Sequence, residues 1–354
     1  MALTSVHIEQ LRCLRAAELS LAPRLTLIQG ANGSGKTSLL EALFLVGRGR
    51  SFRTRQTERL IADGTDLLRV YAQTTEPVHR IGFQYQRDGD YTARIDGRDA
   101  QSLAELPSAV FIEVIDPDIH RLVEGGPAER RRWLDWGVFH VEPQFLPHWL
   151  RYSRALRQRN AALKAGQDPQ IWDRELIEHG VQVDAYRQAW LDSLRPYWDG
   201  AVARLCGLPV QLGYNRGWSQ DKSLDEALAE SRTRDRERGT TQSGPHRADA
   251  PLRLAGSAAR EVLSRGQQKL VAAAMVLATL ARLRELQRQA GGAVPTLLLD
   301  DPAAELDATR LRALVELIQE LDCQLVITSL APDMAVFGQP ERAFHVEQGS
   351  LREL

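Results

Sequence analysis

Cysteine and lysine are both scarce in this sequence of 354 residues. The three cysteines, Cys13, Cys206 and Cys323, are odd in number and far apart, which argues against a disulfide framework and favours reduced thiols in a cytosol. Only four of the 45 Lys and Arg residues are lysines. A bias towards arginine accounts for this scarcity, but it also draws attention to any lysine that stands in a special position.

Long apolar runs and an excess of either charge are absent as well. The longest apolar run, residues 271–281, is too short to span a bilayer, and no basic stretch followed by an apolar one stands at the start of the sequence. We therefore expect a soluble, cytoplasmic protein without a membrane partner. The formal net charge of −1 gives no general attraction to a polyanion, so any contact with nucleic acid would need a local basic patch.

The composition is that of an ordinary globular chain, with 43% hydrophobic and 26% charged residues, and the length suits about two domains. The first 115 residues predict mainly strands, although residues 38–46 have helical spacing. The last third alternates between the two patterns, which predicts a mostly parallel sheet with helices against it. The expected elements there are helices at 266–289 and 307–321 and strands at 296–300 and 324–328.

The middle of the chain has a different character. Residues 127–197 show helical spacing, and we expect Gly166, Gly180 and Pro196 to divide this region into several short helices. Residues 217–245 are polar and predict a solvated linker. The simplest architecture is one α/β domain built from both ends of the chain, with a helical domain inserted between them.

A phosphate-binding loop follows the first apolar strand. The segment Gly30-Ala31-Asn32-Gly33-Ser34-Gly35-Lys36-Thr37 fits the pattern G-x-x-x-x-G-K-[ST] between a predicted strand and a predicted helix. The glycines let successive N–H groups point at one anion, and the helix N-terminus adds its partial positive charge. Lys36 would reach the β and γ phosphates of a nucleoside triphosphate, and the Thr37 hydroxyl suits Mg²⁺. The loop therefore predicts that the chain binds a nucleoside triphosphate with Mg²⁺.

Two later segments would complete such a site. Residues 297–299 form an apolar strand that ends in Asp300 and Asp301, and ligands of an open α/β sheet bind beyond the carboxyl ends of its strands. We expect Asp300 to hold Mg²⁺ and Asp301 to polarise the attacking water. The segment Leu263-Ser264-Arg265-Gly266-Gln267 opens a helix and would form either a second anion site or a plain N-cap.

Taken together, these segments resemble the ABC-type, SMC-like ATPases, and among them the RecF family. The ABC signature Leu-Ser-Gly-Gly-Gln is matched by residues 263–267, with Arg265 in the third place as in RecF-like chains. Other matching segments are residues 50–53, 122–136, 158–163, 244–247 and 300–307. The resemblance implies an α/β fold with an ABC-type P-loop ATPase head and a mixed sheet, formed by residues 1–115 and 246–354. It also implies an inserted α-helical domain with a polar linker at 116–245.

The resemblance further implies a head-to-tail dimer held together by ATP. Ser264, Gly266 and Gln267 of one copy would contact the nucleotide on the P-loop of the other, which makes Lys36, Asp300, Asp301 and Ser264 the expected catalytic set. Asp307 matches a segment that crosses such an interface, and Arg12 matches a basic residue near the phosphates.

Two departures from the ABC pattern predict slow hydrolysis. Asp301 stands where many ABC ATPases have Glu, and Thr328-Ser329 stands where they carry a switch His. A shorter carboxylate and the lack of an imidazole would position water less well, so we expect ATP to act as a timer that closes and reopens the dimer.

The resemblance implies ATP-dependent DNA binding in recombinational repair, replication-fork recovery and the SOS response. RecR and RecO would be partners, and RecA would be helped indirectly to load at single-strand gaps. The candidate contacts with gapped, single-stranded or duplex DNA are two basic groups, Arg50, Arg53 and Arg55 after the P-loop helix, and Arg151 and Arg154 on one later helix face.

Three other classes of protein carry related motifs. The ATPase subunit of an ABC transporter is the main alternative, but it would need membrane partners and usually the missing His. A clamp that binds ATP without hydrolysing it is a second alternative. An SMC or Rad50-like protein is excluded, because about 110 residues interrupted by Gly and Pro cannot form its long coiled coil.

Overall fold

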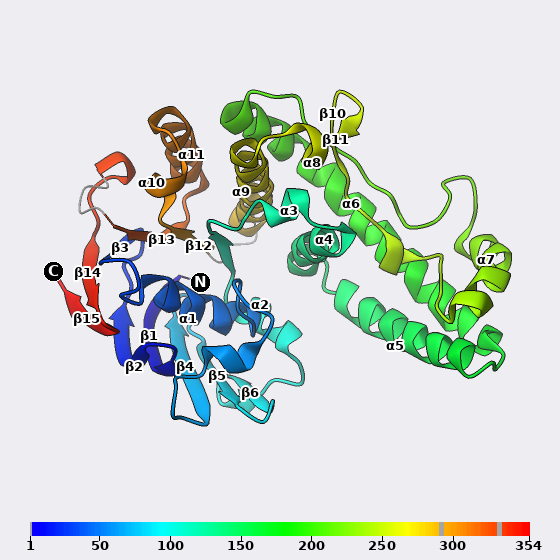
Figure 1. Cartoon of the computed structure of the whole chain (residues 1–354), viewed down its shortest axis with the longest axis horizontal. Coiled ribbons are helices and arrows are strands. Elements are labelled where there is room, and N and C mark those ends of the chain that lie inside the picture. Colours follow the sequence, from blue (N-terminus) through cyan, green and yellow to red (C-terminus); the bar gives the residue numbers. More distant parts are fainter. Residues whose placement is uncertain (1, 290–293, 331–334) are drawn as a thin grey trace. The chain divides into compact units, whose positions relative to one another are not determined.

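The computed structural model describes residues 2–289, 294–330 and 335–354 (Figure 1). The chain forms two compact units: residues 1–119 with 273–354 make unit 1, and residues 120–272 make unit 2. Residues 246–272, which the sequence analysis assigned to the ATPase head, lie in unit 2.

Unit 1 contains a six-stranded sheet with a parallel centre. Its strand order is β15 (Ser350–Glu353), β14 (Arg342–Glu347), β3 (Leu25–Gln29), β13 (Gln324–Ser329), β12 (Thr296–Asp300) and β8 (Ile112–Ile115). The strands from β14 to β8 are parallel, and only β15 is antiparallel to its neighbour. The carboxyl ends of β3, β13 and β12 therefore meet at one edge, where the P-loop follows β3 and Asp300 ends β12.

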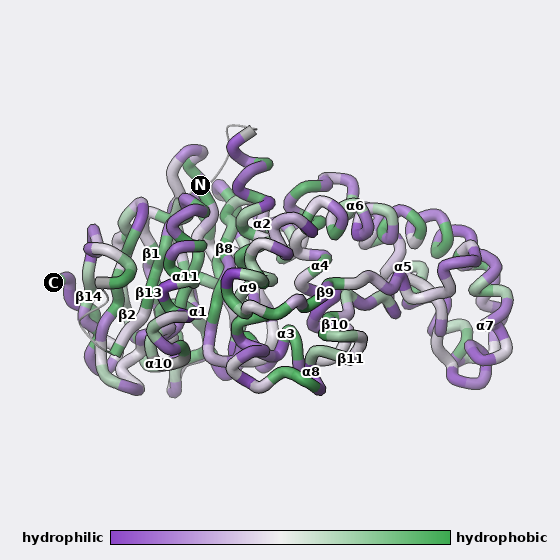
Figure 2. Tube along the Cα trace, turned by 90° about the horizontal axis from the view of Figure 1, so that it is seen from above, coloured by the Kyte–Doolittle hydropathy of each residue, from purple (hydrophilic) through white to green (hydrophobic). Residues whose placement is uncertain are grey.

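A second, antiparallel sheet completes the strands of unit 1. Its order is β2 (Leu14–Ser20), β1 (Leu3–Leu11), β4 (Leu67–Thr74), β5 (Arg80–Gln86), β6 (Tyr91–Ile95) and β7 (Arg98–Asp99). Strands β5 and β6 pair antiparallel as a hairpin, with Phe83 opposite Ala93. Figure 2 shows hydrophobic stretches along the strands of both sheets.

Helix α1 (Lys36–Arg48) lies in the core of unit 1. It contacts strands of both sheets, and residues 38–47 are all buried. Helix α11 (Ala308–Leu321) has one buried stripe, formed by Leu314, Leu317, Ile318 and Leu321 with Val315. Shorter elements of this unit are η1 (Thr57–Leu60), η2 (Leu103–Glu105), α2 (Leu106–Ala109), α10 (Pro302–Glu305) and η5 (Ala335–Phe337).

Unit 2 is mainly helical. Its elements are α3 (Arg121–Glu124), α4 (Pro127–Val141), α5 (Phe145–Lys164), η3 (Pro169–Trp172), α6 (Asp173–Cys206), β9 (Gln211–Leu212), α7 (Leu224–Arg238), η4 (Pro245–Arg247), β10 (Leu252–Leu254), β11 (Ser257–Ala258) and α8 (Ala259–Val262). Helix α9 (Arg265–Gln289) begins in unit 2 and continues into unit 1.

The expected division of this region into several short helices is wrong for α6. This helix runs for 34 residues through Gly180 and Pro196. A Cβ at Gly180 would lie 2.8 Å from Leu224 and 3.1 Å from Tyr152, so this glycine permits close packing between helices and does not end one. Pro196 has no N–H, so the carbonyl of Asp192 lacks its usual helical donor. Both residues are exposed, so water can donate to that carbonyl instead.

The prediction of a solvated linker at 217–245 is also wrong, because this segment contains helix α7. Ser223 and Glu226 form a capping box at its start, and Gly239 ends it with a left-handed φ of 63°. Leu224, Ala227 and Leu228 form a buried face. The polar composition of this segment concealed a helix whose apolar stripe is only a few residues wide.

Candidate nucleotide site

The P-loop has a backbone that glycine makes possible. Gly33 and Gly35 have φ values of 76° and 117°, which side chains other than glycine rarely adopt. A Cβ at Gly30 would lie 2.3 Å from the carbonyl oxygen of Val346 on β14. The strand, the tight loop and the helix that the sequence predicts are therefore all present, and the loop ends where α1 begins.

Lys36 turns back onto its own loop. Its Nζ donates to the carbonyl oxygens of Gly30 at 2.6 Å and Ala31 at 3.0 Å. Burial lowers the pKa of this ammonium, while the carboxylates of Asp301 and Asp300 act in the opposite direction. The two acidic groups at the end of β12 are thus close enough to Lys36 to influence its charge.

Thr37 and Asp300 connect the P-loop helix to β12. The Thr37 hydroxyl lies 3.1 Å from Oδ1 and 3.0 Å from Oδ2 of Asp300. Thr328, on β13, donates its hydroxyl to Asp300 Oδ1 at 2.7 Å. A hydroxyl and a carboxylate are the kinds of oxygen ligand that Mg²⁺ takes in proteins, so Thr37 and Asp300 together fit that ion.

Asp301 has an unusual backbone conformation. Its φ of 48° and ψ of 54° place it in the left-handed region, and its N–H donates to the Thr328 hydroxyl at 3.0 Å. Such conformations cost free energy and gather at functional sites. This observation supports a functional role for Asp301 beyond that of a turn residue.

An unpaired hydroxyl indicates that the loop fits a phosphate. Ser34 is buried, and among the described residues its Oγ has no hydrogen-bond partner. Buried polar groups are almost always hydrogen-bonded in folded proteins. Phosphate oxygens in the loop would provide acceptors for this hydroxyl, for the loop N–H groups and for Lys36, so the residues present fit a nucleoside triphosphate.

The signature segment forms an exposed helix start in unit 2. The N–H of Ser264 donates to Gln267 Oε1 at 2.9 Å, and the N–H of Gln267 lies 3.3 Å from Ser264 Oγ, which makes a reciprocal cap. Ser264, Arg265 and Gly266 are exposed, and no atom of the described residues would lie within 4 Å of a Cβ at Gly266. The structure is therefore compatible both with a plain N-cap and with a second anion site, because the cap is formed and the first turn is open to a ligand.

Comparison with known proteins identifies the family. The family model described as "RecF/RecN/SMC N terminal domain" matches residues 2–350. The chain is 42% identical over 365 residues to proteins named DNA replication and repair protein RecF from Pseudomonas paraeruginosa (strain DSM 24068 / PA7) and Pseudomonas aeruginosa (strain UCBPP-PA14). Each of these matches covers 100% of this chain and 98% of the relative. The chain belongs to the RecF family.

Solved structures agree with this assignment. Two structures described as the recombination mediator protein RecF-ATP and RecF-ATPrS in the RecFOR pathway are 25% identical to this chain, with TM-scores of 0.87 and 0.85. The match to RecF-ATP covers 99% of this chain and 97% of that structure's chain, and the match to RecF-ATPrS covers 100% and 98%. A structure of the Smc head bound to the C-winged helix domain of ScpA, 16% identical with a TM-score of 0.56, shares the fold (100% of this chain, 97% of that chain).

The RecF family is a family of DNA replication and repair proteins with an SMC-like ATPase head, and the predicted fold class is confirmed. The ABC transporter subunit is not favoured, because RecF relatives match the whole chain. In the part of the chain that the structure describes, no helix combines the length and the apolar character needed to cross a bilayer.

Asp307 and Arg12 both have local roles in this RecF-family chain. Asp307 is the N-cap of α11, and its carboxylate accepts from the N–H groups of Thr309 and Arg310. Arg12, in the turn between β1 and β2, is paired with the buried carboxylate of Glu41 on α1. Neither role excludes a further contact with nucleotide, since Asp307 is exposed and Arg12 is 27% exposed.

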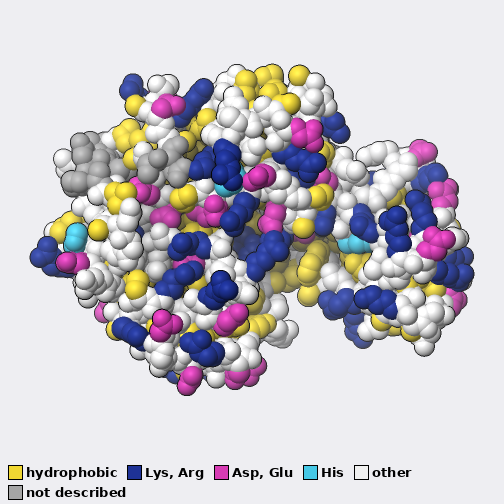
Figure 3. All heavy atoms as spheres, viewed as in Figure 1, with side chains coloured by type: hydrophobic (Ala, Val, Ile, Leu, Met, Phe, Trp, Pro, Cys, Tyr) yellow, Lys and Arg dark blue, Asp and Glu magenta, His cyan; other side chains and the backbone are white. Residues whose placement is uncertain are grey.

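The basic residues predicted for DNA lie in separate units. Arg50, Arg53 and Arg55 are exposed in the segment that follows α1 in unit 1. Arg151 and Arg154 are exposed on α5 in unit 2. Figure 3 shows Lys and Arg side chains gathered over α5 and α7, interspersed with Asp and Glu. Helix α5 itself contains no Asp or Glu, so the acidic side chains of this surface come from other elements of unit 2.

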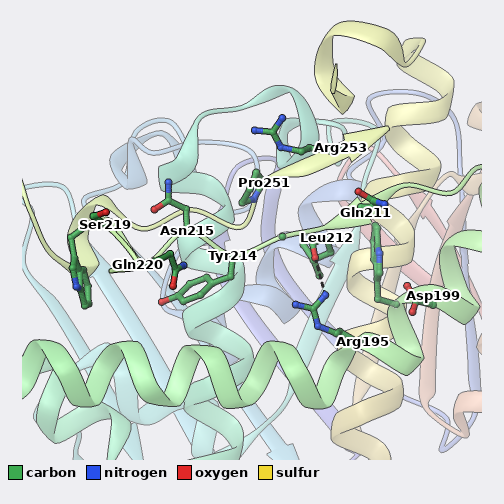
Figure 4. Close-up of a pocket in the computed structure, with 13 residues that line it drawn as sticks. Arg195, Asp199, Gln211, Leu212, Tyr214, Asn215, Ser219, Gln220, Pro251 and Arg253 are labelled. Atoms are coloured by element: carbon green, nitrogen blue, oxygen red, sulfur yellow. Dashed lines mark hydrogen bonds between the residues drawn. The ribbon is translucent and has the colours of Figure 1, made fainter. Parts of the chain in front are cut away.

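Unit 2 also holds a pocket that the sequence analysis did not predict. The pocket has a volume of about 700 Å³ and lies between the C-terminal half of α6 and residues 211–220, with Pro251 and Arg253 on its rim (Figure 4). Arg195 crosses it to donate to the carbonyl oxygen of Leu212 at 3.3 Å. None of the residues predicted for ATP or DNA lines this pocket.

Sequence reasoning missed what Thr328 does. Thr328 was noted only as a replacement for a switch His, yet its hydroxyl is hydrogen-bonded to the carboxylate of Asp300, which ends β12, and to the N–H of Asp301, the next residue. The signal was the parallel pairing of β12 with β13, which sets Asp300 opposite Thr328. That register comes from the sheet and is not visible in either strand alone.

Proposed function

We propose that this RecF-family chain binds ATP with Mg²⁺ at residues 30–37 and Asp300, and that ATP joins two copies into a DNA-binding dimer. The observation that carries the proposal is the contact between the Thr37 hydroxyl and both carboxylate oxygens of Asp300, at 3.0 and 3.1 Å. This contact brings the loop motif and the acidic strand end, which are 263 residues apart in sequence, into one site.

Each residue of the site has a definite task. Lys36 exchanges the carbonyls of Gly30 and Ala31 for phosphate oxygens, and the N–H groups of residues 30–37 surround the same anion. Thr37 and Asp300 hold Mg²⁺, which when bound neutralises charge on the phosphates. Asp301 orients the attacking water.

The second copy completes the site from the opposite side. Its exposed helix start at Ser264, Gly266 and Gln267 supplies a hydroxyl, free first-turn N–H groups and a positive dipole end to the γ-phosphate. Hydrolysis is slow, because Asp301 is shorter than Glu and Thr328-Ser329 stands where a switch His would help to position water. Slow hydrolysis suits a timer that reopens the dimer.

The dimer acts on DNA in recombinational repair, in the cytoplasm and with RecR, RecO and, indirectly, RecA. Arg50, Arg53 and Arg55 from unit 1 and Arg151 and Arg154 from unit 2 contact backbone phosphates without reading sequence. Two copies bring their local patches together, which reconciles DNA binding with a net charge of −1. DNA in turn stimulates the weak ATPase.

Fluorescence anisotropy with a labelled gapped duplex tests this proposal. With ATP, the affinity falls by about a hundredfold between roughly 50 and 300 mM salt if about three phosphates are contacted. Lys36→Ala, which cannot hold ATP, loses the ATP-dependent part of the binding and keeps the remainder. Equal affinity at both salt concentrations, or equal affinity with and without ATP, contradicts the proposal.

A further inference from the structure

A fully buried carboxylate lies in the middle of the P-loop helix. Glu41 is five residues beyond Lys36 on α1, and its side chain is 0% exposed. A carboxylate without water must be paired with cations and hydrogen-bond donors, since an isolated buried charge is very unfavourable. Its partners come from two separate segments of unit 1.

The first partner is Arg12, which lies beside the P-loop. Its Nη2 donates to Glu41 Oε1 at 2.9 Å, and its Nε lies 2.6 Å from Oε2, so the guanidinium meets the carboxylate with two nitrogens. The next residue, Cys13, has its Sγ only 3.0 Å from the place of a Cβ on Gly35. Arg12 therefore directly precedes a residue that packs against the loop that would hold the phosphates.

The second partner is Ser51, at the start of the basic segment 50–55. Its hydroxyl donates to Glu41 Oε1 at 2.5 Å and accepts from the N–H groups of Arg53 at 2.9 Å and Thr54 at 3.1 Å. Arg53 Nη1 lies 3.9 Å from Glu41 Oε2. One hydroxyl thus forms the turn that presents Arg53 and ties that turn to the P-loop helix.

We propose that Glu41 is a positioning residue that couples the nucleotide site to the basic segment 50–55 within one subunit. The coupling rests on the proposed function, because it needs a triphosphate on the P-loop and DNA phosphates at Arg53. A triphosphate beside Arg12 fixes the guanidinium between two anions, and the shared carboxylate transmits that order through Ser51 to the turn at 51–54. A turn that is already ordered binds a polyanion at a lower entropic cost, so the coupling is positive and reciprocal.

Amide hydrogen exchange of the full chain, with and without a non-hydrolysable ATP analogue and without DNA, tests the coupling. In wild type, the analogue slows exchange in the peptide spanning 51–55 by about tenfold. Glu41→Gln keeps the shape of the side chain and removes its charge, and it loses this slowing while still binding the analogue. Ser51→Ala loses it as well and serves as the second variant if Glu41→Gln does not fold. Glu58→Gln, an exposed change in the neighbouring η1, retains it.

A further variant separates this link from dimer formation. Ser264→Ala, which the proposed function expects to stay a single subunit, retains the slowing, because the link runs within one chain. If wild type binds the analogue and the peptide exchanges at the same rate, or if Glu41→Gln keeps the full slowing, the coupling is overturned and the proposed function stands. If wild type binds no analogue at all, both fail.

Discussion

Near the end of β13, the hydroxyl of Thr328 forms hydrogen bonds with Asp300, the last residue of β12, and with Asp301, the residue after it. It donates to Asp300 Oδ1 at 2.7 Å and accepts from the N–H of Asp301 at 3.0 Å. Thr37 reaches the same carboxylate from α1. One hydroxyl therefore determines where the expected Mg²⁺ ligand and the expected water-orienting group lie.

Replacing Thr328 with Val keeps the shape of the side chain and removes these hydrogen bonds. We expect the free energy of unfolding to fall by about 1–3 kcal/mol, because the N–H of Asp301 loses its acceptor. The affinity for ATP with Mg²⁺ falls as well. Urea unfolding and nucleotide titration measure the two effects. Thr328→Ser keeps the hydroxyl and is the matched control, so a Val variant as stable and as tightly binding as the Ser variant argues against this role.

Asp301 can be tested without disturbing its backbone. Asn adopts the left-handed conformation as Asp does, so Asp301→Asn removes the charge and keeps the turn. We expect single-turnover hydrolysis to slow by about 10²–10⁴-fold with ATP binding retained. Asp322→Asn changes another left-handed Asp, with φ of 49°, and should hydrolyse ATP like wild type. Unchanged hydrolysis in Asp301→Asn removes Asp301 from the catalytic set.

The candidate site divides into a part that sequence predicts and a part that it cannot. The loop at 30–37 and the acid at Asp300 are local patterns, because a strand, a tight turn and a helix N-terminus suffice to make them. Thr328 and Glu41 take their roles from strand register and from turns that return to α1. A buried Glu in the helical pattern of residues 38–46 gives no sign of its partners.

The same limit applies to whole elements. Strands β3, β12 and β13 were predictable because each is a short apolar run that must be buried on both faces. Helix α6 was not, because Gly180 and Pro196 are helix breakers in isolation. Only the structure shows that Gly180 allows close packing against Leu224 and that Pro196 lies on the exposed side of the helix. Helix α7 was not predicted either. Its buried face includes Asp235, which is paired with Arg159 on α5, whereas an amphipathic helix pattern has an apolar residue at such a position.

Element η4 in unit 2 contains a half-buried histidine, His246, whose protonation affects stability. His246 Nε2 is 2.9 Å from the carbonyl oxygen of Thr241, so it donates there, and Nδ1 accepts from the Tyr152 hydroxyl at 2.6 Å. Burial lowers the pKa of His246 from 6.5 to about 4, and nearby Arg247 and Arg131 act in the same direction. The folded chain therefore holds this imidazole neutral.

The sign of the pH effect follows from that lowered pKa. As pH falls through 6.5, the unfolded chain binds the proton first, so this contribution to stability is complete above 6.5 and is lost towards pH 4. When the pH falls from 7 to 4.5, we expect the free energy of unfolding of His246→Gln to fall by about 2 kcal/mol less than that of wild type. Urea unfolding at several pH values measures this, with His7→Gln as an exposed control. Identical pH profiles for His246→Gln and wild type would show that His246 is not held neutral.

At the scale of the whole molecule, the two units carry the two groups of residues that the proposed function joins between copies. Unit 1 carries a phosphate loop with Lys36, Thr37 and Asp300, and unit 2 carries an exposed capped helix start at Ser264 and Gly266. A head-to-tail pair would form two nucleotide sites, each made by the phosphate loop of one copy and the helix start of the other. The central claim is therefore that the nucleotide joins two copies.

Sedimentation of the protein with and without ATP and a gapped duplex tests this claim most directly. Wild type should change from one copy to two when ATP is added, and the dimer should sediment with the duplex. Ser264→Ala should bind ATP with an unchanged affinity and remain a single copy, whereas Lys36→Ala should do neither. Wild-type protein that is saturated with ATP and yet sediments as a single copy at every concentration would contradict the account.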